Sequence, residues 1–417
     1  MRITFWKLRG PGKCFSSLSL GGLLFVSFAG VVPAQSFLAG GVQPRLIGTD
    51  LAILEAGEAR QDLPCHAEPV KPLLGFDLKF HAGYEVTLPM HEIAGQENLL
   101  TIVFRVRPVA SPENERYFIQ RVKVPQIEDD AKGDATLQGQ FDLGEGEYKV
   151  DWLMRDRAER VCSSSWDLTA ELPAKDRQIA MNIAANQVGP SDVEFFQPDP
   201  PVMRANEGLL NVKVMINFAP QKMHSAAMKP IDVSALTSIL RTIGRDQRIG
   251  RFSLVVFNMQ DQKVIYRSED QDCFNFPRIG AALDKLKLGT VDFAKLAVKN
   301  SETEFLSGLL EKELTPAEPT DSPYDALVFV GPKVLLDANV PQETLKSVGS
   351  LGYPVFYLNY NLYPQQIPWR DSIGHAVRFF RGQEYTISRP RDLWFAVTDM
   401  VERIRDRQAK RLNQPAQ

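Results

Sequence analysis

The chain has 417 residues, of which 44% are hydrophobic and 24% charged, a composition typical of a globular protein with two or three domains. Its 48 basic and 51 acidic residues leave a formal net charge of −3. This mildly acidic balance argues against nucleic acid or an anionic membrane surface as the main partner.

Residues 1–34 have the pattern of a secretory signal peptide. The start carries only positive charges, at Arg2, Lys7, Arg9 and Lys13, and an apolar run follows from Leu18 to Val32. Small residues at 32–34 fit cleavage after Ala34. The alternative is an uncleaved anchor, but the run of about fifteen residues is shorter than the ~20 of a spanning helix. We therefore expect a secreted or periplasmic protein without an integral membrane segment after cleavage.

The remaining cysteines are Cys65, Cys162 and Cys273. An oxidising compartment favours one disulfide, and we expect it between Cys65 and Cys162 because both lie in the first domain. Closing a loop of about 98 residues stabilises a fold by roughly 4–5 kcal/mol in the chain-entropy model. The alternative is that all of them are free, buried thiols.

Residues 45–172 have the pattern of an antiparallel β-sandwich, with short stretches rich in β-branched and aromatic residues between turn signals. The turns are expected at His81–Gly83 and Gly144–Gly146. Gly146-Glu147-Tyr148 resembles the corner tyrosine of immunoglobulin-like domains. The expected strands are Leu51–Glu55, Phe76–Phe80, Glu85–Leu88, Leu99–Arg107, Tyr117–Val124, Ala135–Phe141, Glu147–Met154 and Val161–Ala170.

Residues 173–208 are expected to form an interdomain linker because they include the proline-rich stretch 197–201. From residue 209 to 406, apolar strands alternate with amphipathic helices, which indicates a doubly wound, mostly parallel α/β sheet. Residues 407–417 are expected to be a disordered tail. The α/β elements are expected near 210–218, 233–243, 252–257, 263–267, 279–288, 305–314, 326–330, 344–348, 355–358, 372–377, 385–387 and 393–404.

This order of elements resembles the von Willebrand factor type A domain, in particular the divergent form found in secreted bacterial proteins. The resemblance covers residues 209–406 and rests on element order. It implies a binding face at the carboxyl ends of the strands, where metal-binding members of the family hold a divalent cation. Their ligands are Asp-x-Ser-x-Ser after the first strand, a Thr in a later loop and an Asp after the fourth strand.

The expected metal ligands are largely missing from this chain. Asn217, Ala219 and Gln221 stand at the first motif, and only Thr290, in Leu288-Gly289-Thr290, matches the second. Gly331-Pro332-Lys333 offers no carboxylate at the third. Because hard cations need negatively charged oxygen ligands, we expect a degenerate site without a metal, and no cofactor.

Two neighbouring features are candidates for binding a partner. Lys222 and Lys333 follow the first and fourth strands, and one ammonium could hold a partner's carboxylate; the alternative is two solvated lysines. The loop 359–375 carries side chains of the types that dominate protein interfaces. Its expected anchors are Tyr360, Tyr363, Trp369 and Arg370. The alternative is a loop folded onto its own domain, with Asp371 or Ser372 capping the next helix.

These patterns predict a non-enzymatic binding or adhesion-type module of the cell envelope. Its partner would be another envelope or secreted protein, or a second copy of the chain. One alternative is a hydrolase-like enzyme with a site in 359–375, where Arg370, Asp371 and His375 lack a nucleophile. Another is a structural component of an envelope assembly.

Overall fold

The computed structural model describes residues 36–37, 48–191, 195–221, 228–284, 300–315, 324–336, 338–362 and 371–412. The chain forms two compact units, the first made of Met1–Arg177 with Met181–Ser191 and the second of Gln178–Ala180 with Asp192–Gln417. The predicted signal peptide lies outside the described residues. Among the helices of the described ranges, none has the length and apolar character needed to cross a membrane.

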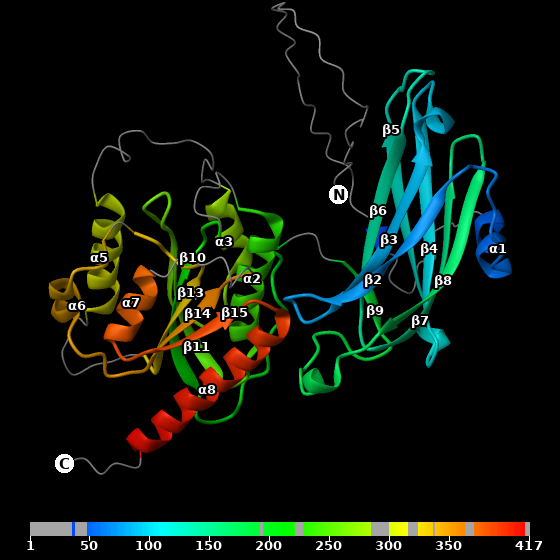
Figure 1. Ribbon diagram of the computed structural model, residues 1–417. Coiled ribbons are helices and arrows are strands. Elements are labelled where there is room, and N and C mark those ends of the chain that lie inside the picture. Colours follow the sequence, from blue (N-terminus) through cyan, green and yellow to red (C-terminus); the bar gives the residue numbers. More distant parts are fainter. Residues whose placement is uncertain are drawn as a thin grey trace, which may run out of the picture. The chain divides into compact units, whose positions relative to one another are not determined.

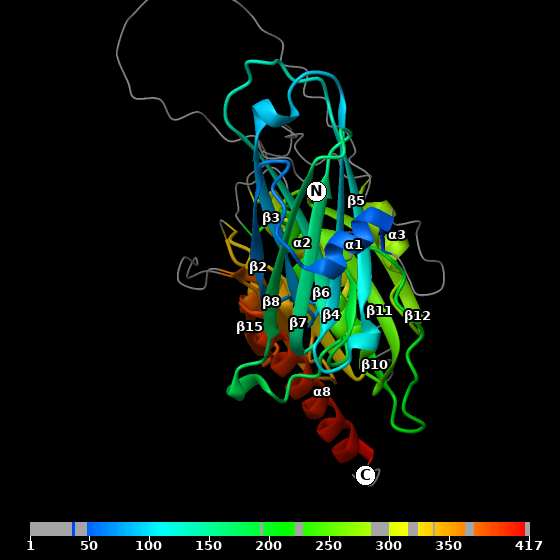
Figure 2. The same cartoon turned by 90° about the vertical axis from the view of Figure 1, so that its right-hand side faces the viewer.

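The first unit contains two antiparallel sheets, which Figures 1 and 2 show from two sides. The five-stranded sheet has the order β1 (Ser36–Phe37), β5 (Arg116–Val124), β4 (Asn98–Pro108), β7 (Gly146–Arg155) and β8 (Val161–Ala170). The four-stranded sheet has the order β2 (His66–Leu74), β3 (Phe80–Pro89), β6 (Asp134–Leu143) and β9 (Val188–Pro190). Short 3₁₀ turns occur at η1 (Met90–Ile93), η2 (Pro112–Asn114) and η3 (Ala174–Asp176).

An aromatic cluster fills the space between these two sheets. The ring of Tyr84 lies 5.4 Å from the rings of both Phe104 and Trp152, and all three side chains are fully buried. The Tyr84 hydroxyl donates to Gln120 Oε1 at 2.6 Å, so its polar end is satisfied inside the core. Such ring pairs contribute about 0.5–1.5 kcal/mol beyond the area they bury.

Residues predicted as the strand Leu51–Glu55 are instead part of the helix α1 (Gly48–Ala56). Figure 2 shows α1 lying across the five-stranded sheet, where Leu54 packs on Val103 and Leu153. The strand prediction was wrong because the apolar stretch is too short to distinguish the two-residue period of a strand from the 3.6-residue period of a helix. Its Ala, Leu and Glu residues favour a helix. The helix ends at Gly57, which has a φ of 66°.

Two further strand-boundary predictions were wrong. Residues 76–79 form a tight turn in which Leu78 has a φ of 57°, and only Phe80 is in a strand, β3, which also contains the predicted turn His81–Gly83. Gly83 is needed there for close packing, because a Cβ would lie 2.1 Å from the carbonyl oxygen of Gly139. An alternating apolar stretch can therefore form a turn, and a glycine can serve close strand packing instead of a turn.

The predicted disulfide is present, and Tyr148 makes a hydrogen bond back to the preceding turn. The Tyr148 hydroxyl donates to the carbonyl of Gly144 at 2.9 Å, a hydrogen bond of the kind expected for a corner tyrosine. Cys65 and Cys162 form a disulfide with a Cα–Cα distance of 6.2 Å, and Cys273 is exposed and free. The disulfide ties the segment before β2 to β8.

The segment 173–208, predicted as a linker, is partly incorporated into the two units. It contains η3 and β9 of the first unit. Asp199 Oδ1 accepts a hydrogen bond from Arg241 Nε at 3.0 Å, and this contact fixes part of the segment on the second unit. The proline-rich pattern marks irregular backbone correctly, but it does not report whether that backbone packs.

The second unit is an α/β structure with a six-stranded sheet in the order β12-β11-β10-β13-β14-β15. All neighbouring strands are parallel except β11 and β12, which form a hairpin. The strands are β10 (Leu210–Asn217), β11 (Ile249–Asn258), β12 (Lys263–Gln271), β13 (Ala326–Gly331), β14 (Val355–Tyr360) and β15 (Gln383–Ile387).

Helices cover both faces of this sheet, as Figure 1 shows. On one face, α5, α6 and α7 pack on Met215, Phe329 and Tyr357. On the other face α2 contacts α8 and β13, and Arg241 of α2 lies over the ring of Phe276 in α3. The helices are α2 (Pro230–Arg245), α3 (Phe276–Leu283), α5 (Ser301–Leu314), α6 (Gln342–Val348), α7 (Ser372–Phe379) and α8 (Pro390–Leu412).

The last helix is longer than the sequence predicts. The apolar stripe ends at Ile404, but α8 continues to Leu412, so residues 407–412 of the predicted tail are helical. Basic residues in the last turn, Lys410 and Arg411, stabilise the negative end of the helix dipole. Residues 413–417 lie outside the described residues.

Candidate functional site

The carboxyl ends of the parallel strands in the second unit gather polar side chains at a topological switch point. The chain runs from β10 to β11 and β12 on one side, and then returns to β13 on the other. In open α/β sheets, ligands bind at the carboxyl edge where the strand order reverses in this way. We name five residues at or beside this edge the carboxyl-end cluster: Asn217 and Asn359 near the ends of β10 and β14, Lys333 after β13, Asp371 before α7, and Glu384 near the start of β15.

Register places these residues on the side of the sheet that α7 covers. Gly331 pairs with Asn359, and Ile216 pairs with Val330, so Asn217 is next to Gly331 on the neighbouring strand. Tyr357, two residues before Asn359 and on the same face, pairs with Glu384 of β15 and packs against α7. The cluster therefore lies on the face of the sheet that α7 covers, next to the N-terminus of α7.

Direct contacts join Lys333, Asn359 and Glu384 of the cluster, and Asp371 contacts the backbone next to Lys333. Asn359 Nδ2 donates to Glu384 Oε1 at 3.0 Å, and Lys333 Nζ lies 3.7 Å from the same oxygen. The amide of Val334 donates to Asp371 Oδ1 at 3.2 Å. The side chains of Lys333 and Glu384 are 24% and 26% exposed, so they form the accessible side of the cluster.

Asp371 is the N-cap residue of α7 and is only 5% exposed. Burial raises the pKa of its carboxyl, the amides of Val334 and Gly374 lower it, and the Glu384 carboxylate raises it further. Burial, together with the Asp371 and Glu384 carboxylates, also raises the pKa of Tyr357. The carboxyl of Asp371 and the hydroxyl of Tyr357 thus lie where water solvates their charged forms poorly.

Several buried polar atoms of this edge have no hydrogen-bond partner within the described parts of the chain. These atoms are Asn217 Nδ2, Asn359 Oδ1, Asp371 Oδ2 and Ser372 Oγ. All four side chains are at most 5% exposed. Leaving such a group unsatisfied costs about 1–3 kcal/mol, so a polar group that reached these atoms would be stabilised.

The positions that the family resemblance assigned to metal ligands are otherwise engaged. Asn217 Oδ1 accepts the amide of Met259 at 3.1 Å, and Gln221 Nε2 donates to Asn361 Oδ1 at 3.1 Å. Ala219 is buried and has no ligand atom in its side chain. A Cβ at Gly331 would lie 2.9 Å from the backbone oxygen of Asn217, so a larger residue does not fit there. Thr290 lies outside the described residues.

Of the residues predicted to bind a partner, the structure describes only Lys333 and Tyr360. Lys333 is at the edge, but Glu384 of the same chain already compensates its charge. The prediction of Tyr360 as an exposed anchor was wrong: it is 1% exposed, and its hydroxyl donates to Asp232 Oδ1 at 3.2 Å. Tyr360 is the last residue of β14, which is buried on both faces. Lys222, Tyr363, Trp369 and Arg370 lie outside the described residues.

Sequence reasoning did not single out Asn359 and Glu384 as site residues. Asn359 is the next-to-last residue of the apolar strand β14 and Glu384 is in the short edge strand β15, so each resembles an ordinary surface residue in the sequence. The available signal was the position of Asn359 at the carboxyl end of a buried strand. Capping of the next helix by Asp371 or Ser372 was one alternative for this loop, and Asp371 is the residue at the N-cap position of α7.

A second polar group lies in the first unit, where Asp77, His81 and Asp142 have ligand atoms within 4.8 Å of one another. His81 Nδ1 donates to Asp142 Oδ1 at 2.8 Å and Nε2 donates to Asp77 Oδ1 at 3.0 Å. Lys79 Nζ donates to Asp142 Oδ2 at 3.0 Å. Two cations balance two carboxylates and both ring nitrogens are engaged, so the group is an ion network rather than an open cation site.

This network predicts a stability that depends on pH. Burial lowers the pKa of His81, but its hydrogen bonds to Asp142 and Asp77 outweigh burial and raise the pKa to about 10. Because the folded pKa exceeds the unfolded value of 6.5, the stabilisation is complete below pH 6.5 and is lost as pH rises toward 10. We expect His81→Gln to lose about 1–2 kcal/mol at neutral pH after allowance for solvent screening.

Urea unfolding of the first unit at several pH values between 6 and 10 measures this effect. The difference between wild type and His81→Gln should shrink toward alkaline pH. The matched control is His66→Gln, whose exposed ring pairs with Glu68, and it should change little at any pH. A pH-independent loss for His81→Gln would contradict the charged network.

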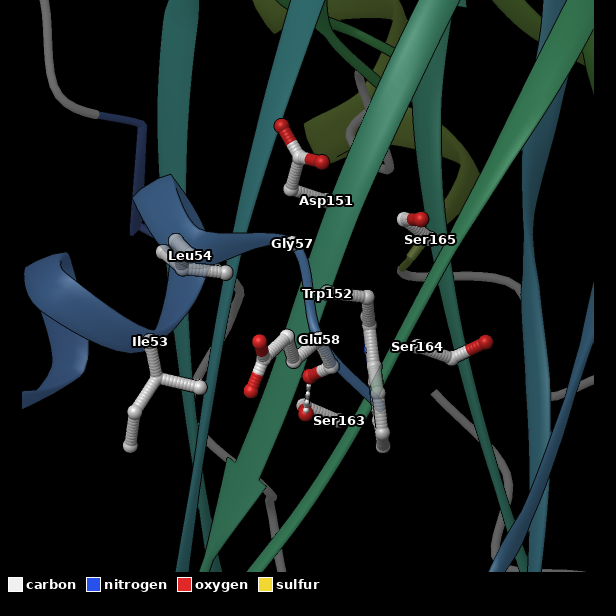
Figure 3. Close-up of a pocket in the computed structure, with 9 residues that line it drawn as sticks. All are labelled: Ile53, Leu54, Gly57, Glu58, Asp151, Trp152, Ser163, Ser164 and Ser165. Carbon is white, nitrogen blue, oxygen red and sulfur yellow. Dashed lines mark hydrogen bonds between the residues drawn. The ribbon is translucent and has the colours of Figure 1, made fainter. Parts of the chain in front are cut away.

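Figure 3 shows a hollow on the first unit, between the end of α1 and strands β7 and β8. Its lining includes Leu54, Asp151 and Trp152, and the Ser163 hydroxyl donates to the Glu58 carbonyl at 3.0 Å. The hollow encloses about 180 Å³, including open solvent. The enclosed part has room for only about one water molecule, so the hollow is too small for an organic substrate.

Comparison with known proteins identifies no family. The chain matches none of the protein-family models and none of the curated proteins. It is similar to VWA2, an ArnB paralog from Sulfolobus acidocaldarius, with 12% identity over 61% of this chain and 51% of that chain, at a TM-score of 0.25. It is also similar to the PilB minor pilin of Streptococcus sanguinis, with 9% identity over 75% of this chain and 90% of that one, at a TM-score of 0.28.

A third similarity is to a β-glucuronidase of Bacteroides uniformis, with 11% identity over 76% of this chain and 38% of that chain, at a TM-score of 0.20. The chain spans about half the length of the Sulfolobus protein. Because these TM-scores are low, the strand order described above, and not the alignments, defines the fold.

Proposed function

We propose that this protein is a non-enzymatic binding module of the cell envelope, which holds a partner protein at the carboxyl-end cluster. The observation that carries the proposal is the set of buried polar atoms without a described hydrogen-bond partner near the ends of β10 and β14 and the start of α7, beside the partly exposed Lys333 and Glu384. A partner group that completes these hydrogen bonds would stabilise the complex. The partner is another envelope or secreted protein, or a second copy of the chain.

We also propose a more specific fold for each of the two units. The second unit is a divergent von Willebrand factor type A-like domain, which its parallel sheet with a single antiparallel strand, β12, supports. The first unit is an immunoglobulin-like sandwich. Its support is the pairing of β3 with β2 and β6, and of β4 with β5 and β7, together with the Tyr148 corner.

A secreted or periplasmic location fits these features. The Cys65–Cys162 disulfide is typical of oxidising compartments, and the start of the sequence has the pattern of a signal peptide. The disulfide thus supports the compartment in which an envelope partner would be met.

Site-specific photo-crosslinking tests the function. A benzophenone amino acid replaces Lys333, and the full mature chain is irradiated in envelope extract of the native organism. We expect one discrete product that excess unlabelled protein suppresses. The matched control places the same group at Asp406, an exposed residue of α8 far along the chain from the cluster. No product at 333, or the same products at both positions, would overturn the proposal.

A further inference from the structure

We propose that the group held at the carboxyl-end cluster is a single basic side chain of the partner, with arginine favoured over lysine. This inference rests on the proposed function and specifies its chemistry. It also reverses the sign of the ligand that the sequence suggested, since a lysine at this edge was expected to receive a carboxylate. The structure gives three independent reasons.

The first reason is charge. Within the cluster, the carboxylates of Asp371 and Glu384 face one ammonium, that of Lys333. The Lys333 ammonium stands 3.7 Å from Glu384, longer than an ordinary hydrogen bond, and both side chains are partly exposed. An incoming cation can therefore join or replace Lys333 at Glu384 without breaking a tight pair.

The second reason is hydrogen-bond polarity. Three of the four unsatisfied atoms can accept a hydrogen bond, namely Asn359 Oδ1, Asp371 Oδ2 and Ser372 Oγ, and each belongs to a side chain that is at most 5% exposed. A ligand rich in donors can satisfy all three atoms, whereas an anion could satisfy only the Ser372 hydroxyl, which can also donate. Hydrogen bonds between a cation and a carboxylate are also about twice as strong as neutral ones.

The third reason is the number and arrangement of donors. A guanidinium presents five N–H donors in a planar fork, against three for an ammonium, so one side chain can supply several acceptors. Guanidinium is also more weakly hydrated than ammonium, which suits the buried position of Asp371. The number of donors and the weaker hydration thus favour arginine over lysine.

Nuclear magnetic resonance titration of the labelled mature chain tests the inference. The probe is acetyl-Gly-Arg-Gly-amide, and its matched control contains citrulline, a neutral isostere of arginine. We expect the arginine peptide to shift the amide signals of Ser372–His375 saturably, with a Kd on the order of 1 mM. The citrulline peptide should bind at least about ten-fold more weakly. Equal binding of both peptides would overturn the inference.

Variants and metal ions sharpen the same experiment. Asp371→Asn should weaken the arginine peptide about ten-fold or more, while Asp406→Asn, on exposed α8, should leave its Kd unchanged. If Asp371→Asn lowers the unfolding temperature, Glu384→Gln takes its place, with a loss of about three-fold or more expected. Calcium or magnesium chloride shifting the same signals at lower concentration than the peptide would overturn the inference in favour of a metal.

The outcome separates this inference from the proposed function. A specific crosslink at position 333 without an arginine response removes the basic side chain and leaves partner binding intact. An arginine response without any crosslink would instead overturn partner binding and leave the binding of a basic group intact. The site would then bind a cation that no envelope protein supplies.

Discussion

Replacing Lys213 by methionine is expected to lower the free energy of unfolding of the α/β unit by about 3–5 kcal/mol. Lys213 lies in β10 and is 7% exposed. Its ammonium donates to the Glu313 carbonyl at 2.7 Å and to Glu313 Oε2 at 3.0 Å, and lies 5.4 Å from the centre of the Tyr324 ring. Removing it leaves the Glu313 carboxylate, which is 8% exposed, buried with less compensation.

Urea unfolding followed by circular dichroism measures this loss, and Arg267→Met is the matched control. Arg267 contacts the other oxygen of Glu313 at 2.8 Å, but its side chain is 37% exposed, so its loss should be about 0–1 kcal/mol. The double variant Lys213→Met with Glu313→Met should recover most of the stability, since a buried pair can be replaced by apolar residues. Equal losses for Lys213→Met and Arg267→Met would contradict the role of burial.

Removing the disulfide is expected to have the largest effect on the first unit. Cys65 and Cys162 are separated by 97 positions in sequence, and the chain-entropy model assigns roughly 4–5 kcal/mol to a loop of this size. Cys65→Ala with Cys162→Ala should therefore move the urea midpoint of the sandwich transition sharply downward. The transition of the α/β unit should stay where it was, because the two units are separate compact bodies.

Cys273→Ala is the matched control for the disulfide variant. Its thiol is exposed and free, so the substitution should change neither transition. Wild-type protein treated with reductant should reproduce the double variant. A midpoint within error of wild type for the sandwich unit would show that the disulfide contributes little to stability.

The α/β elements were the most predictable part of the fold. β10 and β13 are buried along nearly their whole length, so parallel strands there must read as continuous apolar runs. α2 and α5 each bury one face, and the corresponding 3.6-residue spacing is visible in the sequence. In these elements the local pattern and the tertiary environment impose the same requirement.

The sandwich was less predictable because several patterns there have two physical causes. α1 buries Leu54 on the outer face of a sheet, which a short apolar stretch cannot distinguish from a strand. Gly83 permits close approach of Gly139 rather than a turn. The sequence pattern does not predict β2, because its residues are mostly exposed and include two prolines, which are typical of an edge strand.

The location of the candidate site was predictable, but its chemistry was not. Strand order places the binding edge at the carboxyl ends, and Lys333 was found there from sequence. The contact between Lys333 and Glu384 joins residues far apart in the chain, so no local pattern reports it. Tyr360 illustrates the same limit, since the final residue of a buried strand and the first residue of a loop look alike in sequence.

Hydrogen–deuterium exchange with and without the crosslinked partner tests the central claim most directly. The account predicts slower amide exchange in residues 331–336 and 371–375 when the partner binds, with unchanged exchange in residues 403–411 at the end of α8. Protection confined to the first unit, or to α8, would contradict partner binding at the carboxyl-end cluster.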